Sequence, residues 1–65
     1  MTPAEAVINI LAERGFADVT ILNENLRGAV LARVGTPKGW AYEKFAIGER
    51  LAGLVESWAA KHTSR

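Results

Sequence analysis

A glycine-flanked lysine is the first feature of this chain that could do chemistry. Gly35-Thr36-Pro37-Lys38-Gly39 has the glycine content of a loop that holds a phosphate group. A nucleotide-binding loop needs converging backbone N–H groups, a lysine followed by Ser or Thr, and a helix directly after it. Here Pro37 removes one donor, Lys38 is followed by glycine, and an alternating segment comes next. We therefore interpret the segment as a hairpin loop with Lys38 at its exposed tip.

The other reactive side chains form no set that supports catalysis. His62 is the only histidine, and without a cysteine nearby it offers neither a metal site nor a nucleophile-activating pair. We expect it to cap the last turn of a helix. The glutamates are dispersed over polar positions, whereas acid–base catalysis needs two carboxylates in a desolvated cleft. The sequence thus predicts no catalytic residue, no metal and no cofactor, and a protein that is not an enzyme.

Length and composition predict one small folded domain over residues 1–65. A chain of 65 residues buries only ~60% of its unfolded surface, and with no cysteine it has no disulfide to reinforce it. Pairing with a second copy is one way to gain stability, so a homodimer stays open. The net charge of +1 is too small for nonspecific nucleic-acid binding. We found neither a membrane span nor a signal peptide, which predicts a cytoplasmic protein without membrane association.

Two helices are expected at the ends of the chain. Thr2 and Glu5 have the spacing of a capping box, and Gly15 is a C-terminal stop, which predicts a helix at about 3 to 14. A second helix is expected from about Ile47. Its predicted inner arc consists of Ile47, Leu51, Leu54, Val55 and Trp58.

Three strands are expected between the helices, at 18–22, 29–34 and from Trp40 onward. With a five-residue loop at 35–39, Val34 faces Trp40, Ala32 faces Tyr42 and Val30 faces Lys44 on the buried side of the sheet. A loop shorter by one residue would exchange these faces. The predicted fold class is α+β: a helix, a three-stranded antiparallel sheet and a helix, with both helices on one face. The opposite face, with Thr20, Leu22, Leu31, Arg33 and Glu43, is the first candidate contact surface.

The order of elements resembles that of the double-stranded-RNA-binding domain and of the HicA family of toxin ribonucleases. Residues 3–16, PAEAVINILAERGF, are similar in pattern to the first helix and glycine-aromatic step of HicA proteins. HicA proteins carry an essential histidine near the start of the second strand, where this chain has Asn25-Leu26-Arg27-Gly28. The RNA-binding domains carry a lysine cluster where this chain has Arg50 alone. The resemblance therefore implies a similar order and arrangement of helices and strands.

The leading hypothesis is a non-enzymatic interaction protein that binds and modulates a protein partner, as an inhibitor of the kind that phages and mobile elements carry. Its predicted partner-binding residues are Arg27, Leu31, Arg33, Lys38 and Glu43. The alternative is RNA or DNA binding through Arg27, Arg33, Lys38 and Lys44, with exposed aromatic rings that stack on bases. We expect Trp40, Tyr42 and Trp58 to build the core instead.

Overall fold

The chain enters its first helix through a capping box. In the computed structural model, which describes residues 2–63, α1 spans Pro3–Glu13. The Thr2 hydroxyl accepts the Glu5 backbone N–H at 3.2 Å, and the Glu5 carboxylate accepts the Thr2 backbone N–H at 2.9 Å. These two bonds satisfy backbone donors that a helix N-terminus leaves free. The predicted capping box is confirmed, and the helix ends one residue before the expected position.

The same box makes the stability of α1 depend on pH. Hydrogen bonds from the Thr2 backbone N–H and hydroxyl lower the pKa of Glu5 below its ordinary value of 4.5. Because the pKa of Glu5 is lower in the folded state, its ionised carboxylate stabilises the fold fully above about pH 4.5. This stabilisation is lost as the pH falls through the folded-state pKa. We expect Glu5→Gln to unfold with a weaker dependence on acidic pH than the wild type. Urea titrations above and well below pH 4.5 measure this, with Glu13→Gln as control; parallel acid sensitivity of all three proteins would contradict it.

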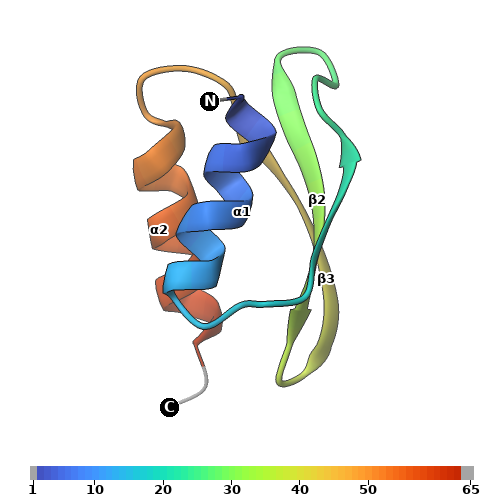
Figure 1. Cartoon of the computed structure of the whole chain (residues 1–65), viewed down its shortest axis with the longest axis vertical. Coiled ribbons are helices and arrows are strands. Elements are labelled where there is room, and N and C mark those ends of the chain that lie inside the picture. The colour runs from blue at the N-terminus through green and yellow to red at the C-terminus, as the bar shows by residue number, and fades with distance from the viewer. Residues whose placement is uncertain (1, 64–65) are drawn as a thin grey trace.

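Three antiparallel strands follow, and a second helix closes the chain. The strands are β1 (Val19–Asn23), β2 (Ala29–Thr36) and β3 (Gly39–Ala46), in the spatial order β1-β2-β3, and α2 spans Leu51–His62. Figure 1 shows both helices side by side on one face of the sheet. The predicted α+β class and element order are confirmed. Neither helix of residues 2–63 is long and apolar enough to cross a membrane.

The core lies between the helices and β2. Val7 and Leu11 from α1, Val55 from α2, and Val30 from β2 are fully buried. Trp58 of α2 also packs in this layer. Its ring centroid lies 5.5 Å from that of Phe16, with the two rings tilted, and 6.1 Å from that of Phe45, with the rings edge to face. The predicted core position of Trp58 is confirmed, since it is only 6% exposed.

The pairing of β2 with β3 differs from the predicted register. The tip of the hairpin holds two residues, Pro37 and Lys38, because Thr36 pairs with Gly39. The Thr36 hydroxyl accepts the Lys38 N–H and donates to the Gly39 carbonyl oxygen, which closes the turn. Gly39 has φ +116°, a conformation that favours glycine.

This shorter tip exchanges the two faces of β3. Phe45 now pairs with Val30 and Glu43 with Ala32, so both lie on the helix-facing side. Trp40 and Tyr42 move to the uncovered side, where they are 53% and 63% exposed. Two predictions were therefore wrong: that these two rings belong to the core, and that Glu43 shares a face with Arg33. The physical reason is the two-residue period of a strand, in which a one-residue shift moves every side chain across the sheet.

The start of α2 also differs from the prediction. The helix begins at Leu51, and Ile47 lies in the connection before it, at 36% exposure. Leu54 is 42% exposed rather than in the core. The buried residues of α2 are Leu51, Val55, Trp58 and Ala59. The inner surface is thus narrower than predicted and is completed by Ala59, whose small side chain permits close packing.

Candidate interaction surface

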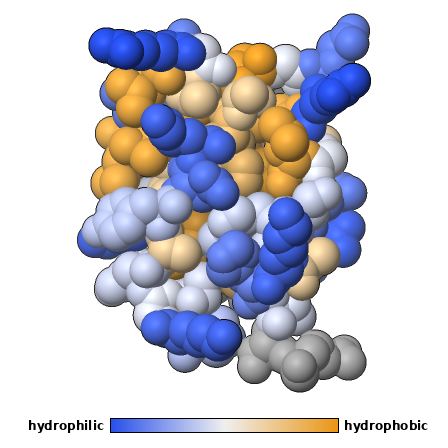
Figure 2. Space-filling model, turned by 180° about the vertical axis from the view of Figure 1, so that it is seen from behind, coloured by the Kyte–Doolittle hydropathy of each residue, from blue (hydrophilic) through white to orange (hydrophobic). Residues whose placement is uncertain are grey.

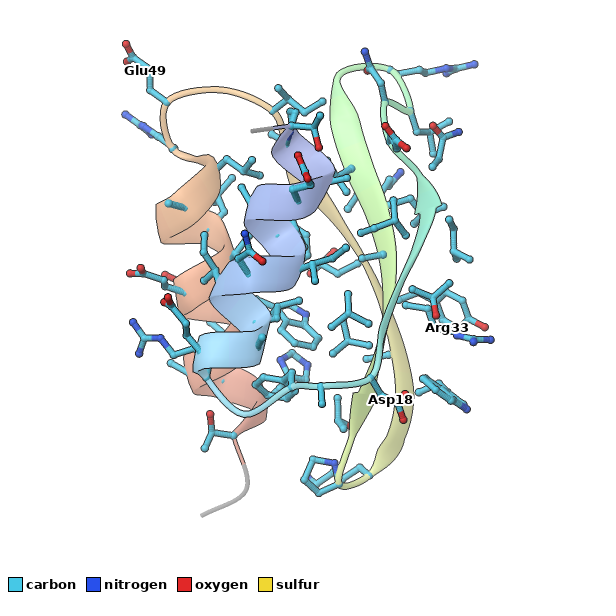
Figure 3. The ribbon with its side chains drawn as sticks, viewed as in Figure 1. Asp18, Arg33 and Glu49 are labelled. Atoms are coloured by element: carbon cyan, nitrogen blue, oxygen red, sulfur yellow. The ribbon has the colours of Figure 1, made fainter. Side chains whose placement is uncertain are left out.

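The helices leave one side of the sheet uncovered, and we call it the open face. Its residues are Thr20, Leu31, Arg33, Gly35, Trp40, Tyr42 and Lys44, because their register alternates with that of the buried side chains. The predicted placement of Thr20, Leu31 and Arg33 on this face is confirmed. Leu22 sits at the irregularity between Ile21 and Asn23 and is 46% exposed. Figure 3 shows Arg33 and Asp18 projecting away from the helices, with Glu49 in the distant loop before α2.

Arg33, Trp40 and Tyr42 form the centre of the open face, and we call them the aromatic cluster. Arg33 pairs across the strands with Tyr42, and its guanidinium carbon lies 4.2 Å from the centre of the Trp40 ring. An exposed cation–π contact of this kind contributes about 0.5–1 kcal/mol. It also orders a long side chain before any partner arrives. The cluster therefore presents two large rings and a positioned cation on paired strands.

Gly35 makes room for this arrangement. A Cβ atom at this position would lie 2.9 Å from the Asp18 Cβ and 3.4 Å from Cζ3 of Trp40. The Gly35 N–H donates to the Asp18 carbonyl oxygen at 2.8 Å, so the backbones of β2 and of the residue before β1 are held together at this point. The missing side chain therefore lets Asp18 approach β2 closely, with the Trp40 indole beside it.

The structure separates the five residues predicted to bind a partner. Leu31 and Arg33 lie on the open face, and Glu43 lies on the other side of the sheet. Arg27 belongs to the turn before β2, and Lys38 belongs to the hairpin tip after it. Since β2 has eight residues, these two exposed cations are about 25 Å apart, at opposite ends of the open face. Only Leu31 and Arg33 of the predicted set are thus brought together.

A hollow of about 310 Å³ adjoins Trp40 at the hairpin end of the molecule. Residues 36–41 line one side, and Lys61, His62 and Thr63 line the other. The lining of described residues contains two lysines and no carboxylate. This hollow is therefore open to an anionic group, and Trp40 supplies an aromatic wall.

His62 is engaged in structural contacts at the end of α2. Its Nδ1 lies 2.9 Å from the Trp58 carbonyl oxygen. Its ring stacks on the Trp58 indole, with the ring centroids 4.0 Å apart. This is the helix-terminal role predicted for it. Within residues 2–63, no three His, Asp or Glu side chains gather as metal ligands do. The chemistry that the described surface offers is therefore stacking, apolar contact and cation pairing.

Trp40 and Tyr42 were not predicted to be surface residues, although the turn before them has a recognisable sequence pattern. Thr36-Pro37-Lys38-Gly39 matches the preferences of a type I turn, which favours proline at its second position and glycine at its fourth. Such a turn is compatible with the observed two-residue tip, but type I turns also occur within longer hairpin loops. The pattern therefore does not by itself decide which face of the sheet carries the two rings.

The other large apolar side chains exposed among residues 2–63 are less exposed than Trp40 and Tyr42. Seen from behind, apolar atoms form separate areas with hydrophilic side chains between them (Figure 2). Ile8, Ile47 and Leu54 are exposed on the helix side but at 36–42% only, less than either ring of the aromatic cluster. The aromatic cluster is therefore the candidate site. Comparisons of the chain with models of known protein families, with curated proteins and with solved structures give no match.

Proposed function

We propose that this chain is a non-enzymatic interaction protein that binds a protein partner through its open face and modulates that partner by covering part of its surface. The observation that carries the proposal is the exposure of Trp40 and Tyr42 on β3, with Tyr42 opposite and Trp40 diagonal to Arg33. Trp, Tyr and Arg are the residue types that most often dominate the binding energy of protein interfaces. A small domain that leaves two large rings in water forgoes core stability that they would otherwise supply.

The cluster is prepared for binding before a partner arrives. Both rings stand on β3, which pairs with β2 along its whole length, and Arg33 is stacked on Trp40. A side chain ordered in advance loses less conformational entropy on binding.

The charges around the cluster indicate the character of the partner. Arg33 and Lys44 lie on the open face, with Arg27 and Lys38 at its two ends and one carboxylate, Asp18, beside Trp40. Most carboxylates belong to the helices or to the loop before α2: Glu5, Glu13, Glu49 and Glu56. A complementary partner surface would present apolar groups and carboxylates to the open face.

The proposal is tested by capture from a lysate of the source organism, followed by measurement of affinity for the captured protein. Trp40→Ala and Tyr42→Ala are each expected to weaken binding by roughly 10- to 30-fold, in the range of interface hot spots. Ile8→Ala is the matched control, because Ile8 is 38% exposed on α1, away from the open face. Capture that is equal for wild type and both aromatic variants, or no specific capture, counts against the proposal.

Single-stranded nucleic acid is a second candidate partner, and one observation favours it. Trp40 and Tyr42 are two residues apart on the same face of β3, a spacing of about 7 Å along the strand. Successive unstacked bases can be held on aromatic rings spaced in this way, with Lys38 and Lys44 at either side. Binding of labelled oligonucleotides at increasing salt tests this, since affinity must fall as salt rises. Absence of binding at low salt would exclude a nucleic-acid partner and would not affect the proposal of a protein partner.

A further inference from the structure

The two edges of the sheet are not equally protected. At the β1 edge the strand has five residues, and the register shifts between Ile21 and Asn23. Such irregularities discourage the addition of another strand. The β3 edge is eight residues long, pairs regularly with β2 and contains no proline. β3 is therefore the edge on which another strand can be added.

The direction of the β3 backbone groups follows from one bond beyond the strand. The Ile47 N–H donates to the Gly28 carbonyl oxygen at 2.8 Å, so residue 47 points its backbone toward β2. Because directions alternate along an antiparallel strand, Trp40, Tyr42 and Lys44 point their backbone N–H and C=O groups toward the free edge. The Lys44 N–H donates to the neighbouring Glu43 carboxylate at 2.9 Å, an exposed bond that another strand can replace.

We propose that a second copy of the chain adds to this edge, antiparallel, with Tyr42 opposite Tyr42 of the other copy and Trp40 opposite its Lys44. This pairing joins outward-pointing backbone groups at all three positions and places a cation over an indole on each side of the two-fold axis. It does not depend on which partner the open face binds.

Charges select this register over its neighbours. A shift of one residue in each copy toward the C-terminus sets Glu43 against Glu43, and a further shift sets Lys44 against Lys44. A shift in the other direction leaves only residues 39–43 of each copy paired and brings Lys44 beside Lys38 of the other copy's hairpin tip. Like charges directly opposite each other destabilise a strand pair. In the proposed register Glu43 lies opposite Ala41, and no like charges face each other within β3.

The consequence for the molecule is a continuous sheet of two copies. The two-fold axis is perpendicular to the sheet, so both open faces lie on one side and the helices of both copies lie on the other. Arg33, Trp40 and Tyr42 of the two copies then form one extended surface. A domain of this size also gains buried surface that its own core cannot supply.

Sedimentation over a wide concentration range, combined with isotope-filtered NMR, tests the proposal. We expect a dimer with strong contacts between the Ala41 Hα of one copy and the Glu43 Hα of the other, because these residues form the closely spaced pair. Tyr42→Pro removes an outward N–H that β2 does not use, and should weaken the dimer at least about tenfold. Tyr42→Ala keeps the N–H and should weaken it less. A monomer at all concentrations, or a dimer that Tyr42→Pro leaves intact, overturns the proposal.

A charge exchange tests the register without proline. Trp40→Lys sets two lysines against each other across the interface and should weaken the dimer. The double variant Trp40→Lys with Lys44→Glu sets opposite charges there and should restore it. Restoration supports the proposed pairing, and equal weakening in both variants contradicts it. Far-ultraviolet circular dichroism and the buried fluorescence of Trp58 check that each variant is folded.

Discussion

Trp58→Ala is expected to remove most of the stability of the fold in water. The indole is 6% exposed and contacts Phe16, Phe45 and His62 through ring packing. Truncation of a buried tryptophan to alanine costs about 3–5 kcal/mol, partly from lost burial and partly from the cavity left behind. A domain of this length has a stability of roughly 3–10 kcal/mol, and its small core favours the lower end. The substitution therefore removes most of the available stability.

The second tryptophan provides the matched control. Trp40 is 53% exposed, and Trp40→Ala removes an indole that is already largely hydrated, together with the Arg33 contact. We expect a loss of about 1 kcal/mol or less. Urea unfolding followed by circular dichroism compares the two variants. Each retains one tryptophan, so blue-shifted emission is expected from Trp58 in Trp40→Ala and red-shifted emission from Trp40 in Trp58→Ala. Equal urea midpoints for the two variants would contradict the assignment of core and surface.

Gly35→Ala is expected to destabilise the fold by about 1–3 kcal/mol through overpacking. The new methyl group would lie 2.9 Å from the Asp18 Cβ, closer than carbon atoms approach without displacement. Asp18 cannot rotate away, because its Cβ is attached to the backbone that accepts the Gly35 N–H. Either that bond lengthens or the two strands separate locally. The Trp40 Cζ3 would lie 3.4 Å from the new methyl group, an ordinary van der Waals distance, so the expected destabilisation comes from Asp18.

Gly53→Ala is the control for this prediction and should act in the opposite direction. Gly53 lies within α2, and a Cβ there would meet nothing within 4 Å. Replacing glycine by alanine inside a helix reduces the entropy lost on folding and contributes about 0.5–1 kcal/mol. Urea midpoints should therefore fall for Gly35→Ala and rise for Gly53→Ala. If Gly35→Ala matches the wild type, the close approach of Asp18 to Gly35 is refuted.

Local sequence features were sufficient to predict the helices and the order of elements. Thr2 and Glu5 determine the start of α1 through contacts within one turn, and such contacts are present in the sequence itself. The inner residues of α1 recur with the helical period, and Val7 and Leu11 are fully buried as that period requires. The start of α2 was predicted less well because Ile47 continues the helical spacing of apolar residues, although the chain there still forms the connection from β3.

The candidate site was only partly predictable. Leu31 and Arg33 could be placed because β2 alternates clearly, with Val30, Ala32 and Val34 fully buried between them. β3 alternates between residues that suit either face: Trp40 and Tyr42 on one side, and Ala41 and Phe45 on the other. Size and apolar character made the larger pair the natural choice for the core. That criterion fails when the space under the helices is already filled by Trp58.

The amino-acid sequence by itself determined the elements, their order and the alternation within each strand, because these depend on neighbours a few residues apart. Only the tertiary structure decided which side of β3 is buried. Both registers of the hairpin preserve the alternation, so the choice depends on packing: Phe45 lies against Trp58, and Ala41 accompanies Val34 under the helices. Since a one-residue shift reverses a strand, that choice also placed Trp40 and Tyr42 in solvent beside Arg33, and so created the surface from which the function is proposed.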